Sequence, residues 1–137
     1  MKPSIHHIAL IASSRRTVEF YEQLGFSVER VILREAKGDT VVLMSSDGGW
    51  LEIFIDPSHP PRPEGKEPLG IRHFALSVDD LDSAAARFGG QPIGRDWAGV
   101  RYTVVRDPDG VAVELREAKP VPGVPGRPGE QEKPKNN

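Results

Sequence analysis

One pattern of residues occurs twice in the chain, and this repeat constrains the fold more than any other feature. The first copy has His-Ile-Ala-Leu at 7–10 and Asp-Gly-Gly-Trp-Leu-Glu-Ile at 47–53. The second copy has His-Phe-Ala-Leu at 73–76 and Asp-Gly-Val-Ala-Val-Glu-Leu at 109–115. A motif that returns at a similar spacing indicates two copies of one supersecondary unit. The sequence therefore predicts two tandem modules of related structure.

The first module, residues 4–56, has the pattern of a βαβββ unit. A short apolar run rich in isoleucine opens it, as expected of a buried strand. Ser13 or Ser14 is expected to cap a following helix, which Gly25 ends. One face of this helix is predicted to carry Val18, Tyr21 and Leu24. Turn residues separate the later strands, and the expected strands of the module are 5–12, 26–34, 39–45 and 50–55.

A proline-rich connector, residues 57–70, follows and excludes helix and central strand. The second module, residues 71–118, repeats the βαβββ order. Its helix is expected to begin after Asp79-Asp80 and to end at Gly89-Gly90, and its predicted strands are 71–78, 92–96, 100–106 and 111–117. Residues 119–137 lack hydrophobic anchors and are expected to form a disordered tail. The predicted fold is α+β, one domain over 1–118 with mixed-sheet pairing of the strands.

Composition limits the classes of function. A net charge of −2 gives no electrostatic case for nucleic-acid binding. The chain has no cysteine, so a metal would have to be held by nitrogen and oxygen. No apolar run reaches membrane-spanning length, and the first residues lack a signal-peptide pattern. We therefore expect a cytoplasmic protein with no membrane partner, acting on a small molecule.

The alternation of side chains along a strand indicates where the repeated histidines and glutamates point. In strands 50–55 and 111–117, Glu52 and Glu114 lie on the face opposite the aliphatic residues. His7 and His73 occupy equivalent positions in the first strand of each module. An unpaired charge is disfavoured inside a sheet, yet both modules keep these residue types at matched positions. We therefore predict that His7, Glu52, His73 and Glu114 bind one metal ion.

Two imidazoles and two carboxylates suit a borderline divalent ion with positions left for water or substrate. Nickel or zinc is the first expectation for this site, with cobalt, manganese and iron as alternatives. His6 is expected on the opposite strand face, in a structural role. Trp97 and Arg101 are expected on or beside a hairpin that could border a pocket, and His59 is expected to be solvated in the connector.

The motifs resemble the vicinal oxygen chelate superfamily, also called the glyoxalase, bleomycin-resistance and dioxygenase family. The resemblance covers about residues 4–118 and is closest to small proteins of the lactoylglutathione-lyase-like group. It rests on the repeated residues together with four motifs, found at 6–10, 20–26, 70–75 and 107–110. It implies paired βαβββ modules whose sheets curve around a metal, and a homodimer is common in such proteins.

Within that superfamily, the set His7, Glu52, His73 and Glu114 resembles the ligand set of glyoxalase I. The resemblance implies a metal-dependent lyase or isomerase acting on a hemithioacetal-like substrate with vicinal oxygens. The metal would bind both oxygens and acidify the C–H between them. Glu114 would act as the general base that carries the proton.

Two positions separate the chain from glutathione-using members of the family. Ile11 stands where such proteins tend to have Arg, and Asp56 stands where they have Asn. The substrate and any thiol cofactor therefore stay open. The alternatives are a non-catalytic small-molecule binding or resistance protein, and an extradiol-type dioxygenase. The sequence also leaves open whether each site forms within one chain or across a dimer.

Overall fold

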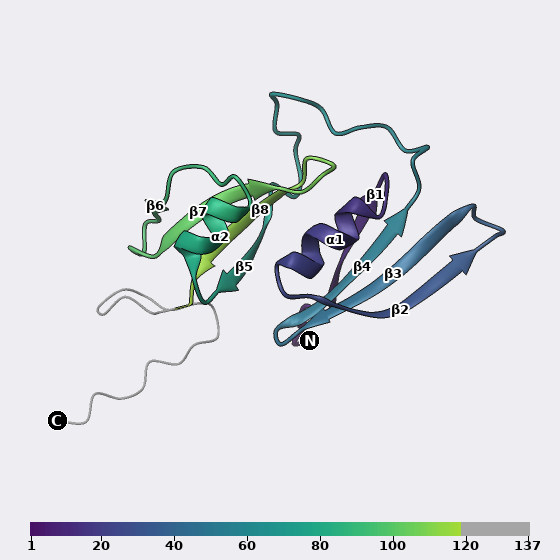
Figure 1. Cartoon of the computed structure of the whole chain (residues 1–137), viewed down its shortest axis with the longest axis horizontal. Coiled ribbons are helices and arrows are strands. Elements are labelled where there is room, and N and C mark those ends of the chain that lie inside the picture. The colour runs from purple at the N-terminus through teal and green to yellow at the C-terminus, as the bar shows by residue number, and fades with distance from the viewer. Residues whose placement is uncertain (119–137) are drawn as a thin grey trace. The chain divides into compact units, whose positions relative to one another are not determined.

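The computed structural model describes residues 1–118, so the predicted tail at 119–137 lies outside the described residues. The chain divides into two compact units. Among residues 1–118, unit 1 contains residues 1–67 and 107–111, and unit 2 contains residues 68–106 and 112–118. Each unit holds one four-stranded mixed sheet and one helix in the order βαβββ (Figure 1). The predicted α+β class and the tandem βαβββ modules are confirmed.

Unit 1 contains the sheet of the first module, with strand order β1-β4-β3-β2. Strands β1 and β4 are parallel, whereas the other neighbouring pairs are antiparallel. The chain must cross the sheet between β1 and β2, and helix α1 provides this connection. The elements are β1 (His7–Ala12), α1 (Arg16–Gln23), β2 (Ser27–Arg34), β3 (Asp39–Ser46) and β4 (Gly49–Ile55).

Helix α1 differs from the expectation at its beginning and agrees with it at its end. Its N-cap residue is Arg15, and no side chain caps the helix. Ser14 Oγ instead accepts a hydrogen bond from the backbone N–H of Arg16, which lies at the first helical position. Gly25 follows the C-cap with φ 107°, a backbone conformation that residues with a Cβ atom rarely adopt. Gly25 therefore ends the helix as predicted.

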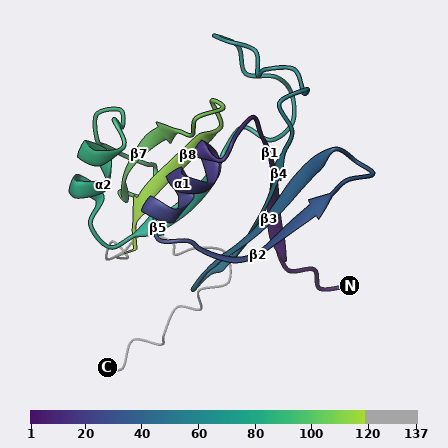
Figure 2. The same ribbon diagram turned by 45° about the vertical axis from the view of Figure 1, so that its right-hand side comes forward.

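The core of unit 1 lies between α1 and one face of its sheet. Val18 and Tyr21 of the helix are fully buried, and so are Leu51 and Ile53 of β4. In both views, α1 lies against one face of this sheet (Figures 1 and 2). Full burial stabilises each such aliphatic side chain by roughly 1.5–3 kcal/mol relative to exposure. The opposite face of β4, with the alternate residues, is left for the site described below.

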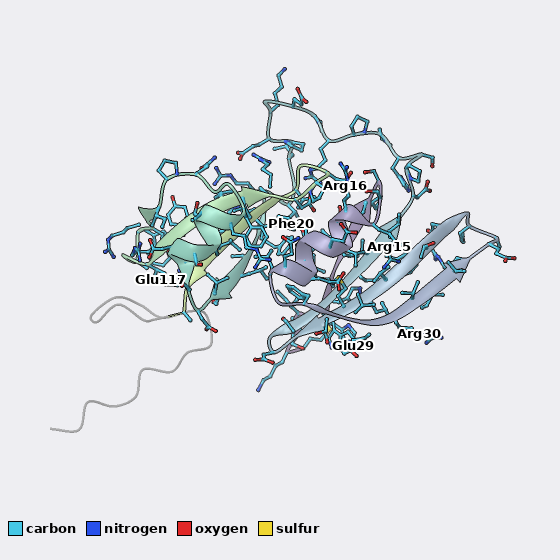
Figure 3. All side chains as sticks on the ribbon, viewed as in Figure 1. Arg15, Arg16, Phe20, Glu29, Arg30 and Glu117 are labelled. Atoms are coloured by element: carbon cyan, nitrogen blue, oxygen red, sulfur yellow. The ribbon has the colours of Figure 1, made fainter. Side chains whose placement is uncertain are left out.

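Strand β2 forms an edge of the sheet in unit 1. Its pairing with β3 shifts register between Val28 and Arg30, which indicates a bulge. Glu29 at this bulge accepts a hydrogen bond from Ser45 Oγ at 2.6 Å, and Figure 3 shows Glu29 and Arg30 on this strand. A charged, bulged edge opposes pairing with another strand.

Unit 2 repeats the topology with strand order β5-β8-β7-β6, and β5 and β8 are its parallel pair. Helix α2 packs against β7 and β8. Asp80 caps it, as predicted, by accepting a hydrogen bond from the N–H of Ser83. After the helix, a Cβ atom on Gly90 would lie 2.7 Å from Thr103 Oγ1, so the chain needs glycine there. The elements are β5 (Phe74–Val78), α2 (Leu81–Arg87), β6 (Gly94–Arg95), β7 (Arg101–Arg106) and β8 (Ala112–Glu117).

The turn at residues 107–111 contacts α1 within unit 1. Tyr21 Oη donates a 2.9 Å hydrogen bond to Asp107, which is 4% exposed. Asp107 also accepts from the backbone N–H groups of Asp109 and Val111. Burial raises the pKa of Asp107 above its ordinary value, although these hydrogen bonds oppose the change. Thr17 donates to Asp109 at 2.8 Å, so the turn is tied to the helix by two carboxylates.

Between β4 and β5 the chain has neither helix nor strand, as predicted for the proline-rich connector at 57–70. No helix among residues 1–118 is long and apolar enough to cross a membrane.

Candidate metal centre

The first predicted pair, His7 and Glu52, is brought together on the sheet of unit 1. Ala9 of β1 lies opposite Glu52 of β4 in the parallel register. His7 comes two residues earlier, so it shares the strand face of Ala9. The Nε2 atom of His7 lies 3.1 Å from Oε2 of Glu52, and the side chains are 39% and 28% exposed. The pair is therefore accessible from solvent.

The second predicted pair, His73 and Glu114, has the same construction in unit 2. Ala75 of β5 lies opposite Glu114 of β8, and His73 again comes two residues earlier. The Nε2 atom of His73 lies 3.9 Å from Oε1 of Glu114. One detail differs from the expectation, because β5 begins at Phe74 and His73 immediately precedes it. The repeated sequence motif thus produces the same local arrangement in both units.

Each pair has the donor types that a divalent metal requires, and the His7–Glu52 pair also has the spacing. Nitrogen and oxygen ligands at about 2.0–2.2 Å from a metal lie roughly 3–3.5 Å from each other. The separation of 3.1 Å in the first pair lies within this range, and the separation of 3.9 Å in the second pair is longer. Among residues 1–118, no group of three or more His, Cys, Asp or Glu side chains is placed to hold a metal ion. Each unit thus offers two donors, and a centre that contains all four stays a prediction.

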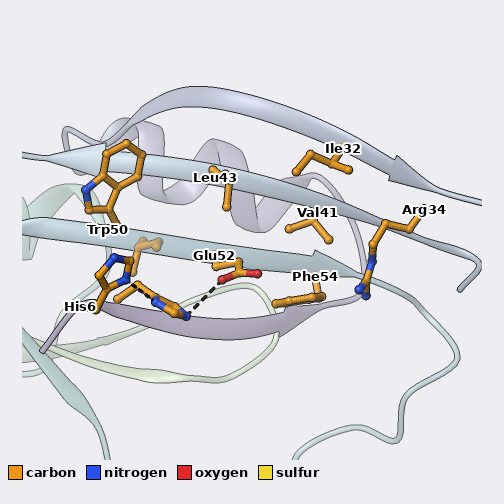
Figure 4. Close-up of a pocket in the computed structure, with 10 residues that line it drawn as sticks. His6, Ile32, Arg34, Val41, Leu43, Trp50, Glu52 and Phe54 are labelled. Atoms are coloured by element: carbon orange, nitrogen blue, oxygen red, sulfur yellow. Dashed lines mark hydrogen bonds and ion pairs between the residues drawn. The ribbon is translucent and has the colours of Figure 1, made fainter.

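The His7–Glu52 pair lies in a cavity of about 550 Å³ on the face of the sheet opposite α1. Figure 4 shows α1 behind the strands and the labelled side chains on the near face. The wall is mainly apolar. The cavity is lined by His6, His7, Ile32, Arg34, Val41, Leu43, Trp50, Leu51, Glu52 and Phe54. A volume of this size is typical of pockets that bind small molecules.

His6 also lines this cavity, so its expected position on the opposite strand face is wrong. Strand β1 begins at His7, and the alternation of a strand therefore does not apply to the residue before it. The Nδ1 atom of His6 lies 2.8 Å from Nδ1 of His7. Because a neutral imidazole carries one N–H, this contact requires one ring to donate and the other to accept. His6 thus holds the orientation of the His7 ring.

Glu114 has a cationic neighbour that the sequence reasoning missed. Arg116 lies two residues further along β8 on the same face, and its Nη1 atom is 3.3 Å from Glu114 Oε2. Its Nη2 atom is 2.8 Å from Asp96 Oδ2. Burial favours a higher pKa for Asp96, but N–H groups of Val100 and Ala98, together with Arg116, outweigh it and lower that pKa. A charged Asp96 therefore holds Arg116 beside Glu114.

The equivalent neighbour of Glu52 is apolar. Phe54 occupies the position two residues after Glu52, where Arg116 follows Glu114. The two carboxylates therefore match in backbone position and differ in their surroundings. Strand parity, which placed the glutamates, would also have placed Arg116 on the face of Glu114.

Ile11 and Asp56, the two positions that depart from the glutathione-binding pattern, both lie in unit 1. Ile11 is on the strand face of His7 and is 51% exposed. Asp56 accepts hydrogen bonds from the backbone N–H and the hydroxyl of Ser58, which lower its pKa. The Nε2 atom of His59 lies 3.5 Å from Asp56. The carboxylate of Asp56 therefore already accepts hydrogen bonds within a local turn. His59 lies beside it and is half-exposed.

Trp97 and Arg101 differ in their surroundings. Trp97 is 86% exposed. Arg101 forms ion pairs with Asp82 and Glu117 at 2.8 and 2.6 Å. The positive charge of Arg101 is therefore balanced by two carboxylates of unit 2.

Comparison with known proteins identifies the family. The model of the Glyoxalase/Bleomycin resistance protein/Dioxygenase superfamily matches residues 4–115. The chain belongs to this superfamily. The matched range spans both modules, so the resemblance inferred from the repeated motifs is confirmed. Members of this superfamily share the tandem βαβββ architecture found here.

Individual relatives of this superfamily match most of the chain. Uncharacterized protein YaeR from Escherichia coli (strain K12) is 35% identical over 122 residues, which are 82% of this chain and 95% of YaeR. The crystal structure of a glyoxalase family protein from Enterococcus faecalis shares 34% identity with a TM-score of 0.74, covering 83% of this chain and 97% of that one. A lactoylglutathione lyase from Agrobacterium tumefaciens, with 23% identity and a TM-score of 0.57, covers 85% of this chain and 95% of its own and shows a shared fold.

Proposed function

We propose that this chain is a metal-dependent isomerase or lyase of the glyoxalase I type. Its substrate would be a small molecule with two vicinal oxygens, such as a hemithioacetal. The observation that carries the proposal is the pair of His–Glu contacts built with one register in both units. Membership of a superfamily that includes such lyases supports it, as does the fold shared with a lactoylglutathione lyase.

His7, Glu52, His73 and Glu114 are the residues that would hold the metal. Nickel or zinc suits this donor set, with cobalt, manganese and iron as alternatives. When bound, the ion would supply Lewis-acid polarisation of the substrate oxygens, which acidifies the C–H between them. The protein's own part is to keep two imidazole nitrogens and two carboxylates available at positions set by strand register.

Glu114 is the residue that we propose as the general base. It would take the proton from one carbon of the substrate and return it to the neighbouring carbon, so no net proton is gained or lost. Such a transfer requires a carboxylate in a fixed position. Arg116 contributes by holding Glu114 Oε2 at 3.3 Å.

The cavity beside His7 and Glu52 would hold the body of the substrate. Its wall is mainly apolar, so a bound substrate would displace water from the space next to the polar pair. Exclusion of water strengthens charge interactions with a bound substrate. The cavity therefore fits a compact substrate with one oxygen-rich end.

An assay of methylglyoxal–thiol hemithioacetals with several thiols and metals tests this proposal. We expect isomerisation that depends on about one divalent ion per site, measured by elemental analysis of untagged protein. Glu114→Gln should lower turnover by about 100-fold or more, because a positioned general base contributes at least that much. His73→Ala should lower both the bound metal and the turnover.

Two control variants separate these effects from loss of any histidine or carboxylate. His59→Ala and Glu29→Gln change the same residue types outside both pairs, and both should leave turnover and metal content unchanged. If no thiol and no metal gives isomerisation, the proposed reaction is wrong.

A non-catalytic binding or resistance protein is the second candidate, favoured by the mainly apolar wall of the cavity. Ligand binding that is indifferent to a chelator, in a metal-free protein, would support this candidate. The extradiol alternative requires iron(II) and should leave Glu52 dispensable. The His7–Glu52 contact at 3.1 Å argues against that alternative, and full activity of Glu52→Ala with a catechol would favour it.

A further inference from the structure

A cation lies at the far end of the cavity from the two histidines. Arg34 is the last residue of β2 and pairs across the hairpin with Asp39, the first residue of β3. Its Nε and Nη2 atoms donate to the two oxygens of Asp39 at 2.7 and 2.5 Å. Figure 4 shows His6 and Trp50 at one end of the cavity, Arg34 at the other, and Glu52 between them.

The ion pair with Asp39 leaves part of the guanidinium free. A guanidinium has five N–H donors, and Asp39 accepts from Nε and Nη2 only. Among residues 1–118, Nη1 has no hydrogen-bond partner. The side chain of Arg34 is 36% exposed, whereas that of Asp39 is 10% exposed. Asp39 therefore fixes the orientation of the Arg34 guanidinium. The Nη1 edge of this guanidinium is free to donate, and Arg34 lines the cavity.

Phe54 connects this cation to the polar pair. The guanidinium carbon of Arg34 lies 5.0 Å from the centre of the Phe54 ring. Phe54 follows Glu52 by two residues on the same face of β4, a distance of roughly 7 Å along a strand. The charge of Glu52 contributes to the raised pKa of Arg34, after the larger effect of the Asp39 hydrogen bond. Arg34 is thus a fixed cation within reach of a ligand that also contacts Glu52.

The wall between these two ends is apolar. Ile32, Val41, Leu43 and Phe54 line this part of the cavity. A ligand that fills the cavity would place a non-polar body along them and a polar group at each end. Arginine recognises planar anions through two parallel N–H groups, and a carboxylate has the matching shape.

We propose that Arg34 and Phe54 form a subsite for a carboxylate on the substrate, across the apolar wall from its vicinal oxygens. This inference rests on the proposed function, because the oxygens are assigned to the His7–Glu52 end. It narrows the substrate class to compact anionic molecules with an aliphatic or aromatic body. Glutathione-using members of the family tend to have Arg where this chain has Ile11. The proposal agrees with this difference, because Arg34 would bind the anion elsewhere in the same unit.

Two matched chelators test the subsite by isothermal titration calorimetry of metal-loaded protein. 4-Carboxybenzohydroxamate presents two vicinal oxygens and, across a ring, a carboxylate; 4-carbamoylbenzohydroxamate replaces the carboxylate with a neutral amide. We expect the carboxylate probe to bind about fivefold or more tightly, the effect of one partly exposed charged hydrogen bond. Arg34→Gln should reduce this ratio to about one, and Arg34→Lys should retain part of it because the charge remains.

Lys37→Gln is the matched control, because it removes one positive charge from the same hairpin outside the cavity wall. It should leave the ratio unchanged. Three results would each overturn the subsite. The ratio of the two probe affinities could be the same in the wild type and in Arg34→Gln, the wild type could bind both probes equally, or the carboxylate probe could fail to bind.

The same titrations distinguish this failure from failure of the proposed function. If the protein isomerises neutral hemithioacetals and the affinity ratio of the two probes is one, the subsite is refuted and the proposed function is retained. If the affinity ratio depends on Arg34 in protein that has neither metal nor isomerase activity, the subsite is supported and the proposed function is refuted. Thermal unfolding of each variant confirms that it is folded before its ratio is interpreted.

Discussion

Glu52 and Glu114 occupy equivalent backbone positions but have different neighbours. Phe54 follows Glu52 on the same strand face, whereas Arg116 follows Glu114 and contacts it at 3.3 Å. Asp96 holds Arg116 from the other side at 2.8 Å. The Nε atom of Arg116 is buried without a hydrogen-bond partner among residues 1–118. Arg116 is therefore held between Asp96 and Glu114, and a residue that positions a carboxylate in this way would tune it as a metal ligand if Glu114 binds the metal as we propose.

We predict that Arg116→Met lowers kcat/KM for the proposed isomerisation by about 10–100-fold, the usual effect of removing an outer partner of a ligand. Arg116→Lys should restore part of the activity, because a cation near Glu114 remains. Steady-state kinetics on folded protein with measured metal content checks this.

Arg101→Gln is the control for the arginine prediction. It removes another ion-paired arginine of unit 2, one that contacts Asp82 and Glu117 rather than Glu114. Its kcat/KM should equal that of the wild type. Unchanged kinetics of Arg116→Met would show that Glu114 does not depend on this contact.

Part of the candidate site was predictable because strand parity is a local property. It placed Glu52 and Glu114 opposite the buried aliphatic rows, and the structure has them there. His6 was misplaced because the strand begins one residue later. Asp96 could not be predicted as a partner of Arg116, because its position depends on a turn and on pairing across the second sheet.

The turn at 107–111 makes side-chain hydrogen bonds with α1. Pro108 and Gly110 are residue types that favour a turn, and the structure has a turn there. Its contact with α1 was not predictable, because Tyr21 lies far from Asp107 in the sequence. Tyr21 donates to the buried carboxyl group at 2.9 Å, and burial raises the pKa of both side chains.

We predict that the stability advantage of the wild type over Asp107→Asn falls as the pH rises above about 4, the ordinary pKa of an aspartate. The pKa of Asp107 is raised in the folded state, so folding favours its protonated form. That contribution is complete below the unfolded pKa and is lost as pH rises through the folded pKa. Urea unfolding of both proteins at several pH values measures the difference.

Tyr21→Phe provides the comparison for this pH series. It keeps the carboxyl group and removes one buried hydrogen bond, which should lower the free energy of unfolding by about 1–3 kcal/mol. A wild-type advantage over Asp107→Asn that grows with pH would contradict the direction given for Asp107.

The element boundaries show where local signals were insufficient. The predicted strand 92–96 is reduced to β6, Gly94–Arg95. Pro92 has no N–H to donate to a sheet. Asp96 uses its side chain to accept from the N–H groups of Ala98 and Val100, which forms a turn. The seven other predicted strands are present in the expected order. Their side chains follow a period of two, and glycine and proline mark the turns between them.

For the whole molecule, the main consequence of the repeat is that each unit contains one His–Glu pair. Unit 1 contributes His7 and Glu52, and unit 2 contributes His73 and Glu114. Two donors alone bind a divalent ion weakly, and four would complete most of a coordination shell. We propose that a homodimer completes it, with unit 1 of one chain and unit 2 of its partner at each of two equivalent sites.

This proposal predicts complementation between two inactive variants. His7→Ala and His73→Ala should each bind little metal alone. In a heterodimer of the two, one site lacks both histidines and the other has all four ligands. Random exchange makes half of the dimers heterodimers, so about a quarter of all sites should regain metal and turnover. Subunits are mixed, exchanged under mild denaturant and assayed after dialysis against the metal. Recovery of no metal would instead show that each site forms within one chain, since no exchange of partners could then restore a missing ligand.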